Sequence, residues 1–176
     1  MTGDPLELFH EWVQGDEMVI ATATSDGRPS ARALLLKSAD ERGFTFFTGY
    51  TSRKGRELEQ NPRAALLFRR DGIQVRVEGP VERIGAEESD AYWRTRPAGS
   101  RRSAAASNQS EPIGSREELG AAVAAQPAEP ERPERWGGFR LVPDTYEFWR
   151  HRDDRLQERH LFKARGDGWE RSILQP

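Results

Sequence analysis

The chain has 176 residues, with 27 Lys and Arg against 29 Asp and Glu, so its formal net charge is −2. This length suits one domain with a sizeable core, and the near balance of charge argues against a nucleic-acid-binding protein, which usually carries a strong excess of basic residues. The sequence has no cysteine and no apolar run near the roughly 18 residues of a membrane helix, so we expect a soluble, cytoplasmic protein without disulfides or a membrane partner.

The first predicted element is a helix within residues 1–16. Asp4 stands where a helix cap is expected, and Pro5 follows it at the favoured first position. Apolar residues then recur on one helical face, so this helix should pack that face on the protein core.

Short strands dominate the remainder of the chain. Apolar and β-branched runs between turn residues predict strands at 18–24, 31–38, 44–48, 63–68, 73–84, 136–141, 145–150, 160–164 and 169–174. In the longest run Ile73, Val75 and Val77 alternate with polar residues, as in a half-buried strand. Further helices are predicted at 51–61, 86–96 and 115–126, and a loop at 99–111.

These elements predict a mainly β, α+β protein. Most turns are short, so neighbouring strands should pair in the antiparallel direction. No strand–helix–strand rhythm indicates a doubly wound sheet, and we expect a small antiparallel barrel with flanking helices. A single domain should span residues 1–176, with the N-terminal helix in 1–16 and a loop, a helix and a Pro-rich connector in 97–135.

Ser52, Arg53 and Lys54 stand at the start of the predicted helix 51–61. The helix dipole disfavours cations at this end, whereas the free N–H groups there attract anions. Basic side chains beside a hydroxyl therefore favour a phosphate site, with a solvated basic turn as the alternative.

Arg32 and Lys37 bracket an apolar strand that we expect to be buried. A buried cation needs a partner, and a phosphate would supply one. Because side chains alternate along a strand, the two residues should face opposite sides. They would then serve two different anions, unless one of them reaches out to water.

Tyr92 and Arg96 lie four residues apart on one face of a predicted helix, and Ser100 follows the end of that helix. Two hydroxyls and a guanidinium suit a phosphate monoester. The alternative is an ordinary exposed helix end.

Trp149, Arg155 and Arg159 form a last group near the C-terminus. Trp149 could pack against a flat aromatic ligand, although a buried Trp in a short strand is more often part of the core. The two arginines could share a helical face or flank a turn.

The three histidines, His10, His151 and His160, occur without the H-E-x-x-H spacing of a zinc site. A zinc site needs three or four Cys, His, Asp or Glu ligands, and the sequence has no cysteine and no such spacing of its histidines. We therefore expect no metal site and interpret all three histidines as surface residues.

Nine short motifs follow one another along the chain. They are RALLLK (32–37), FFTGYTSRKGRELEQNPRAALLF (46–68), QVRVEG (74–79), YWRTRP (92–97), NQS (108–110), WGGFRL (136–141), EFW (147–149), RLQER (155–159) and the closing LQP. In this order they resemble the pyridoxamine 5'-phosphate oxidase family over nearly the whole chain. The resemblance implies an antiparallel FMN-binding split β-barrel, in which two chains form a homodimer with two FMN sites at the interface.

The same resemblance implies roles for individual residues. The FMN site would consist of Arg32, Ala33, Leu34, Leu35, Leu36, Lys37, Phe47, Thr48, Ser52, Arg53, Lys54, Gln74, Gln109, Ser110, Trp149 and Arg159, some of them from the partner chain. A phosphorylated small-molecule substrate would be bound by Lys37, Tyr92, Arg96, Ser100, Arg155 and Gln157. Arg155 and Gln157 would face the substrate ring as the catalytic residues, and Arg32 and Lys54 would hold the FMN phosphate.

The implied reaction converts pyridoxamine or pyridoxine 5'-phosphate to pyridoxal 5'-phosphate. Hydride would leave the carbon that bears the amine or hydroxyl and pass to the flavin, and dioxygen would reoxidise the flavin to give hydrogen peroxide. An amine substrate would leave as an imine, which water hydrolyses to the aldehyde and ammonia. The cofactor carries the redox work and the protein supplies placement and electrostatics, which explains why the sequence shows no strong nucleophile.

Two segments depart from the family pattern, both on the substrate side. The family's arginine–leucine–histidine–aspartate–arginine signature reads RLQER at 155–159, and Gln157 cannot become cationic as a histidine can. Residues 101–106 replace a segment that usually carries glycine and tryptophan.

These departures leave two alternatives open. One is a related flavin oxidase that acts on a different reduced ring, such as a dihydrophenazine-like intermediate of secondary metabolism. The other is a non-catalytic module that binds flavin or pyridoxal phosphate. Lys37, Tyr92, Arg96 and Ser100 favour a phosphorylated substrate over the first alternative.

Overall fold

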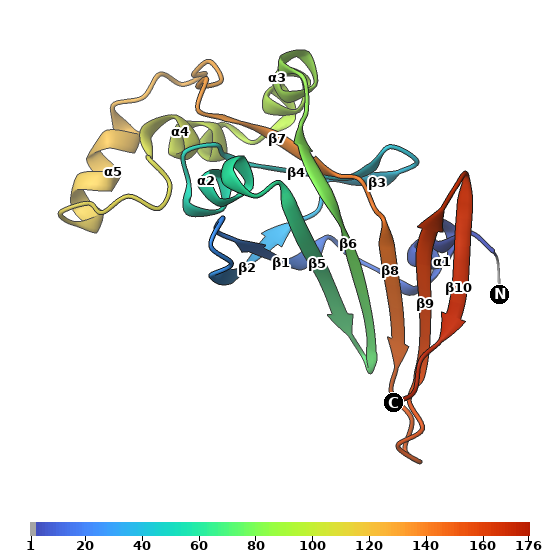
Figure 1. Cartoon of the computed structure of the whole chain (residues 1–176). Coiled ribbons are helices and arrows are strands. Elements are labelled where there is room, and N and C mark those ends of the chain that lie inside the picture. The colour runs from blue at the N-terminus through green and yellow to red at the C-terminus, as the bar shows by residue number, and fades with distance from the viewer. Residues whose placement is uncertain (1–2) are drawn as a thin grey trace.

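A curled antiparallel sheet forms the body of the protein (Figure 1). The computed structural model describes residues 3–176. The elements in these residues are α1 (Pro5–Trp12), β1 (Glu17–Ala23), β2 (Pro29–Leu35), β3 (Ser38–Asp40), β4 (Gly43–Gly49), α2 (Arg53–Gln60), β5 (Arg63–Arg70), β6 (Ile73–Arg83), α3 (Ala86–Thr95), α4 (Ala98–Ala106), α5 (Arg116–Ala124), β7 (Trp136–Leu141), β8 (Thr145–Arg150), β9 (Glu158–Arg165) and β10 (Gly168–Ile173). Helices α2 to α5 gather at one end of the sheet, towards the top of Figure 1.

Strand β6 belongs to both halves of the sheet. The main path runs β10-β9-β8-β6-β5-β1-β2, and each printed pair of neighbours is antiparallel. Residues 81–83 of β6 pair instead with β7, which continues through β4 to β3. This shared strand curls the sheet into a half-open barrel, so the antiparallel split barrel expected from the sequence is confirmed.

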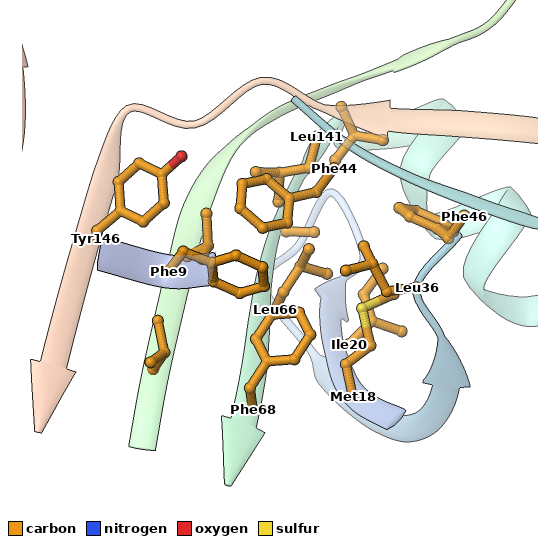
Figure 2. Close-up of a cluster of buried hydrophobic side chains, with 14 of the residues drawn as sticks. Phe9, Met18, Ile20, Leu36, Phe44, Phe46, Leu66, Phe68, Leu141 and Tyr146 are labelled. Atoms are coloured by element: carbon orange, nitrogen blue, oxygen red, sulfur yellow. The ribbon is translucent and has the colours of Figure 1, made fainter. Parts of the chain in front are cut away.

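One row of buried side chains crosses the inner face of the sheet. The strand register aligns Ile20, Leu66, Val77, Tyr146 and Phe162. Figure 2 shows aromatic side chains from α1 and β4 packed against this row. Each large apolar side chain buried here stabilises the fold by roughly 1.5–3 kcal/mol.

Helix α1 covers part of this core, as its sequence predicts. Asp4 caps the helix, because its Oδ1 accepts a hydrogen bond from the backbone N–H of Leu6 at 2.8 Å. Leu8, Phe9 and Trp12 are buried against the sheet. None of the helices in residues 3–176 has the length and apolarity that a membrane span requires.

The outer face of the sheet changes in character from one side to the other. Ala33, Val19 and Leu67 align across β2, β1 and β5, and the same row continues into Arg76 and Glu147 on β6 and β8. The first part of this row is apolar and partly exposed, whereas the second part is charged. One half of the outer face is therefore suited to apolar contacts and the other half to ionic contacts.

Strand β2 is an edge strand, which corrects the expectation of a buried strand at 31–38. It pairs with β1 along its length, and alternate residues are exposed to solvent. Leu35 on the outer face is 44% exposed. An edge strand of one chain is buried only if another surface covers it.

The loop predicted at 99–111 is wrong, because α4 occupies most of it. Four of the nine residues of α4 are alanine, the strongest helix former, and Pro97 stands at the N-cap. The short strand β3 was also missed: residues 38–40 pair with residues 43–45, so only residues 41 and 42 form the turn to β4. His160 is buried rather than superficial, because its side chain on β9 points inwards with Phe148 and Phe162 on neighbouring positions.

Candidate functional site

The start of α2 lies against the end of β4. Ser52 is fully buried and caps the helix, since its Oγ accepts a hydrogen bond from the N–H of Gly55 at 3.2 Å. A side chain at position 55 would clash with the carbonyl oxygen of Tyr50, so glycine permits this close packing. The basic segment singled out in the sequence is therefore held rigidly by its own backbone.

Arg32 and Arg53 meet at one buried carboxylate, Glu57. Arg53 Nε lies 2.9 Å from Glu57 Oε1, and Arg32 Nη2 lies 3.2 Å from Oε2. Thr22 and Ser30 donate hydrogen bonds to the same Oε2 at 2.5 and 2.6 Å. Burial alone would raise the pKa of Glu57, but these four hydrogen bonds outweigh it and lower the pKa to about 2.

Lys54 is buried beside this group, with only 5% of its surface exposed. Its Nζ donates hydrogen bonds to Thr48 Oγ1 at 3.0 Å and to Ser52 Oγ at 3.5 Å. Burial, with a smaller contribution from Arg32, lowers the pKa of Lys54 to about 8, and Glu57 partly opposes this shift. An ammonium group with two neutral partners retains the capacity to bind an anion.

Gln109 and Ser110 reach the same place from the segment after α4. Gln109 Oε1 accepts hydrogen bonds from Thr48 Oγ1 at 2.9 Å and from the N–H of Gly49 at 3.1 Å. Ser110 Oγ accepts one from the N–H of Arg53 at 3.1 Å. The structure thus brings together seven residues that the resemblance places in an FMN site: Arg32, Thr48, Ser52, Arg53, Lys54, Gln109 and Ser110.

A cavity of about 430 Å³ opens next to this cluster. Its lining consists of Leu34, Phe47, Thr48, Gly49, Thr51, Arg96, Gly99, Ser100, Ser103, Ala104, Ser107, Gln109, Arg135 and Trp136. Thr48 joins the two features, because it lines the cavity and also contacts Lys54. The cavity is therefore adjacent to the cationic cluster at α2.

Arg96 lies in the wall of this cavity, with its guanidinium 4.6 Å above the ring of Trp136. In the described part of the chain its Nη1 is buried without a hydrogen-bond partner. Burial lowers the pKa of Arg96, and nearby Tyr92 partly opposes this. A half-buried cation with a buried N–H group that lacks an acceptor indicates a place for an anionic ligand.

Tyr92 lies behind the cavity and stacks on Phe47, with ring centroids 3.9 Å apart. Ser100 lines the cavity from the first turn of α4. Of the residues expected to bind a substrate, Tyr92, Arg96 and Ser100 are thus grouped here. Lys37 lies elsewhere, where its Nζ forms an ion pair with Asp16 at 3.3 Å.

Several cavity residues were not predicted from the sequence. Ser103 in α4 and Ser107 at its C-cap were missed because this segment was expected to be a loop. Trp136 was assigned only to a strand, and Arg135 to the Pro-rich connector. Arg135 Nη2 donates a hydrogen bond to the carbonyl oxygen of Ala105 at 2.5 Å, which ties the connector to the end of α4. A basic and an aromatic residue at the start of a strand were the available signal.

A second group of predicted residues lies on the outer face of the sheet. Gln74, Trp149 and Arg159 are direct neighbours across β6, β8 and β9. Arg159 Nη2 lies 2.6 Å from Glu147 Oε1, and Arg76 Nη2 lies 2.7 Å from Glu147 Oε2. Glu147 is thereby buried between two arginines, which fixes the position of Arg159.

Arg155 and Gln157 lie in the turn between β8 and β9, so the turn and not the helix is the correct alternative for this segment. Arg155 has a φ of 64°, a conformation uncommon for residues with a side chain. Gln157 Oε1 accepts a hydrogen bond from the N–H of Arg152 at 2.8 Å. In residues 3–176 neither residue lines the cavity beside α2.

Residues 3–176 contain no group of three or more His, Cys, Asp and Glu side chains that could hold a metal ion. The arrangement is instead one of cations, hydroxyls and flat aromatic rings. Such a donor set binds phosphate groups and planar ligands.

Comparison with known proteins agrees with this chemistry. The family profile described as pyridoxamine 5'-phosphate oxidase matches residues 8–126. A curated relative from Rubrobacter xylanophilus, a pyridoxine/pyridoxamine 5'-phosphate oxidase, is 50% identical over 98% of this chain and 87% of its own length. The chain belongs to the pyridoxamine 5'-phosphate oxidase family.

Further relatives of this oxidase family support the membership. A pyridoxine/pyridoxamine 5'-phosphate oxidase from Bordetella avium is 52% identical over 98% of this chain and 89% of its own length. The crystal structure of PhzG from Burkholderia lata in complex with tetrahydrophenazine-1-carboxylic acid has a TM-score of 0.92 and 34% identity, covering 99% of this chain and 94% of that one. An oxidase-related, FMN-binding protein from Nostoc punctiforme has a TM-score of 0.77 at 20% identity, over 97% of this chain and 93% of its own, and shows the same fold.

The C-terminal part of the chain matches a second profile of the oxidase family. Residues 136–176 correspond to the pyridoxine 5'-phosphate oxidase C-terminal dimerisation region. This region comprises β7 to β10 and carries four of the predicted site residues, Trp149, Arg155, Gln157 and Arg159.

Proposed function

We propose that the protein is an FMN-dependent oxidase that converts pyridoxamine or pyridoxine 5'-phosphate to pyridoxal 5'-phosphate and reduces dioxygen to hydrogen peroxide. A single domain over residues 1–176 would carry this activity. The observation that supports it best is a pair of separate cationic positions. Arg96 lies in the wall of the cavity beside Trp136, and Lys54 with Arg32 and Arg53 lies next to the cavity, behind Thr48. Two phosphorylated molecules, cofactor and substrate, need two such positions.

The residues at α2 fit the phosphate of FMN. Lys54, Arg32 and Arg53 supply three cations, and buried Ser52 supplies a hydroxyl at a helix start. The proposed site further includes Gln109 and Ser110, with Phe47, Thr48 and the backbone from Ala33 through Leu34, Leu35 and Leu36 to Lys37 beside the flavin ring. When bound, FMN supplies the hydride acceptor and the reaction with dioxygen.

The proposed substrate site uses the second cationic position. Arg96 and Ser100 would bind the substrate phosphate, with Tyr92 held on Phe47 beside them. The stacked rings of Phe47 and Trp136, whose centroids lie 5.5 Å apart, would hold the substrate ring in a low-dielectric environment and limit the access of water. Lys37, which the resemblance assigns to the same phosphate, does not line this cavity and pairs with Asp16 instead.

A second copy of the chain would complete the site. Gln74, Trp149 and Arg159 are fixed on the outer face of the sheet, away from the cavity of their own chain. The match to a dimerisation region supports a homodimer in which this row, with Arg155 and Gln157, faces the cavity of the partner. In this arrangement Arg155 and Gln157 would orient the substrate ring and exchange hydrogen bonds with it.

Release of hydrogen peroxide by the flavin-loaded protein tests this proposal. Pyridoxine phosphate and pyridoxamine phosphate should each give peroxide and pyridoxal 5'-phosphate. Their non-phosphorylated forms should react poorly, because Arg96 would then lack its anion. Turnover of a reduced phenazine-type ring alone would favour the alternative oxidase, and flavin binding without peroxide from any of these compounds would favour a carrier.

A further inference from the structure

Glu57 is a buried carboxylate in the middle of the cationic cluster, and only 3% of its surface is exposed. Both of its carboxylate oxygens accept hydrogen bonds. Oε1 accepts a hydrogen bond from Arg53, while Oε2 accepts one from Arg32 and two from the hydroxyls of Thr22 and Ser30. Four groups from β1, β2 and α2 therefore meet at one side chain.

We propose that Glu57 is a positioning residue for phosphate binding, whose carboxylate fixes Arg32 and Arg53 at the start of α2. This inference rests on the proposed function, since it takes the phosphate of FMN as the anion that these arginines bind. Arg53 is otherwise free to move, because 59% of its side chain is exposed. The ion pair with Glu57 already restricts the rotamers of Arg53 before the phosphate binds. Less conformational entropy is then lost on binding.

Charge alone would argue against a carboxylate at this point. Arg32, Arg53 and Lys54 carry three positive charges. The negative charge of Glu57 lowers the net charge of the cluster by one, which weakens the attraction for a phosphate. The carboxylate therefore helps binding only through geometry. Positioning and charge thus predict opposite effects when the negative charge is removed.

Glutamine at position 57 separates these two effects. It has nearly the same shape as glutamate, but its amide has one acceptor oxygen and one NH₂ group, which only donates. The two arginines approach opposite oxygens of the carboxylate, so in Glu57→Gln at least one arginine faces a donor and loses its partner. The variant therefore gains net positive charge and loses the alignment of the cations.

The matched control lies on the same helix. Glu59 is exposed and forms an ion pair with Arg83 at 2.8 Å, away from Arg32 and Arg53. Glu59→Gln changes the net charge by the same amount and leaves the cluster intact. Any difference between the two variants therefore reports on the contacts of Glu57.

The dissociation constants of FMN and riboflavin, measured by flavin fluorescence on the full-length protein freed of flavin, test the inference. Glu57→Gln should weaken FMN binding about tenfold, the equivalent of one charge-assisted hydrogen bond, and leave riboflavin binding unchanged within about twofold. Glu59→Gln should behave as the unmodified protein. FMN binding in Glu57→Gln that is unchanged or tighter would overturn the positioning role.

Two further results keep the test decisive. If the unmodified protein binds FMN no better than riboflavin, the phosphate assignment fails and the inference fails with it, whereas a clear preference for FMN that Glu57→Gln retains overturns the inference alone. If Glu57→Gln does not fold, Ser30→Ala replaces it, because Ser30 donates to Glu57 and accepts from Arg32 without carrying charge. This variant should weaken FMN binding about threefold with riboflavin unaffected, and equal FMN binding would count against the proposal.

Discussion

The ammonium of Lys54 lies 3.0 Å from the hydroxyl of Thr48, and this contact joins the cationic cluster at α2 to the cavity beside it. Burial lowers the pKa of Lys54 to about 8. Charged groups that face Lys54 are Arg32, which lowers the pKa, and Glu57, which raises it. The charge of this lysine is therefore lost within an accessible range of pH.

We predict that FMN binding weakens as the pH rises through about 8, because only the protonated Lys54 attracts the phosphate. Riboflavin binding should change little over the same range. The measurement is the dissociation constant of each flavin between about pH 7 and 10. A lysine with the usual pKa near 10.4 would stay mostly protonated over this range. Lys54→Arg stays charged throughout and should lose this pH dependence; a flat profile for FMN in the unmodified protein would contradict the assignment.

Glu57 should also contribute to stability in acid. Its pKa is about 2 in the folded protein, against an ordinary value of 4.5, so its stabilising effect is complete above 4.5 and disappears as the pH falls towards 2. Glu57→Gln should therefore show a shallower loss of unfolding free energy over this range than the unmodified protein. Urea unfolding at several acidic pH values measures this, with Glu59→Gln as the control, and parallel curves for Glu57→Gln and the unmodified protein would exclude the effect.

Arg96 should affect the substrate and not the flavin. Its guanidinium rests on Trp136 and its buried Nη1 lacks a partner among the described residues. Arg96→Ala should raise KM for pyridoxine phosphate about tenfold to a hundredfold, as expected for the loss of hydrogen bonds to a charged group. Arg96→Lys should recover part of this loss through its charge, but not the flat stacking. Loss of bound flavin in either variant would place Arg96 in the other site.

Gln157 replaces the histidine expected at its position in the family signature. A histidine there is partly protonated near neutral pH and would strengthen the binding of an anionic ring oxygen or phosphate. Gln157→His should raise kcat/KM for pyridoxine phosphate several-fold, up to about tenfold. Leu156→Ala in the same exposed turn is the control. Unchanged or lower activity would indicate that the substrate site has adapted to glutamine.

The exposed apolar part of the outer sheet face should be covered in the homodimer. Val19 and Leu35 are 37% and 44% exposed in the single chain and lie on adjacent strands. Val19→Glu, at a position outside the proposed FMN site, should shift the protein from dimer to monomer and reduce its flavin content, because each FMN site would need both chains. Light scattering and the flavin absorbance of the purified protein measure this. Ile113→Glu, at an exposed residue outside the sheet, should leave the dimer intact; a flavin-loaded monomer of the unmodified protein would refute a shared site.

The order of elements was largely readable from local patterns. The alternation of Ile73, Val75 and Val77 marked a half-buried strand, and Asp4 with Pro5 marked the start of α1. Local propensity failed at 99–111, where a run of small and basic residues was taken for a loop although its alanines favour α4. The family resemblance also rested on the sequence alone, because motifs in a fixed order need no coordinates.

Only the tertiary structure decided which of these residues meet. Arg32 and Arg53 are 21 positions apart in the sequence, yet both contact Glu57, a residue that no sequence pattern singled out. The division of the predicted site into a cluster at α2 and a row at Gln74, Trp149 and Arg159 also became visible only in the folded sheet. The physical reason is that periodicity and propensity report on neighbours along the chain, whereas a charge inside a protein is stabilised by groups that strand pairing brings from distant positions.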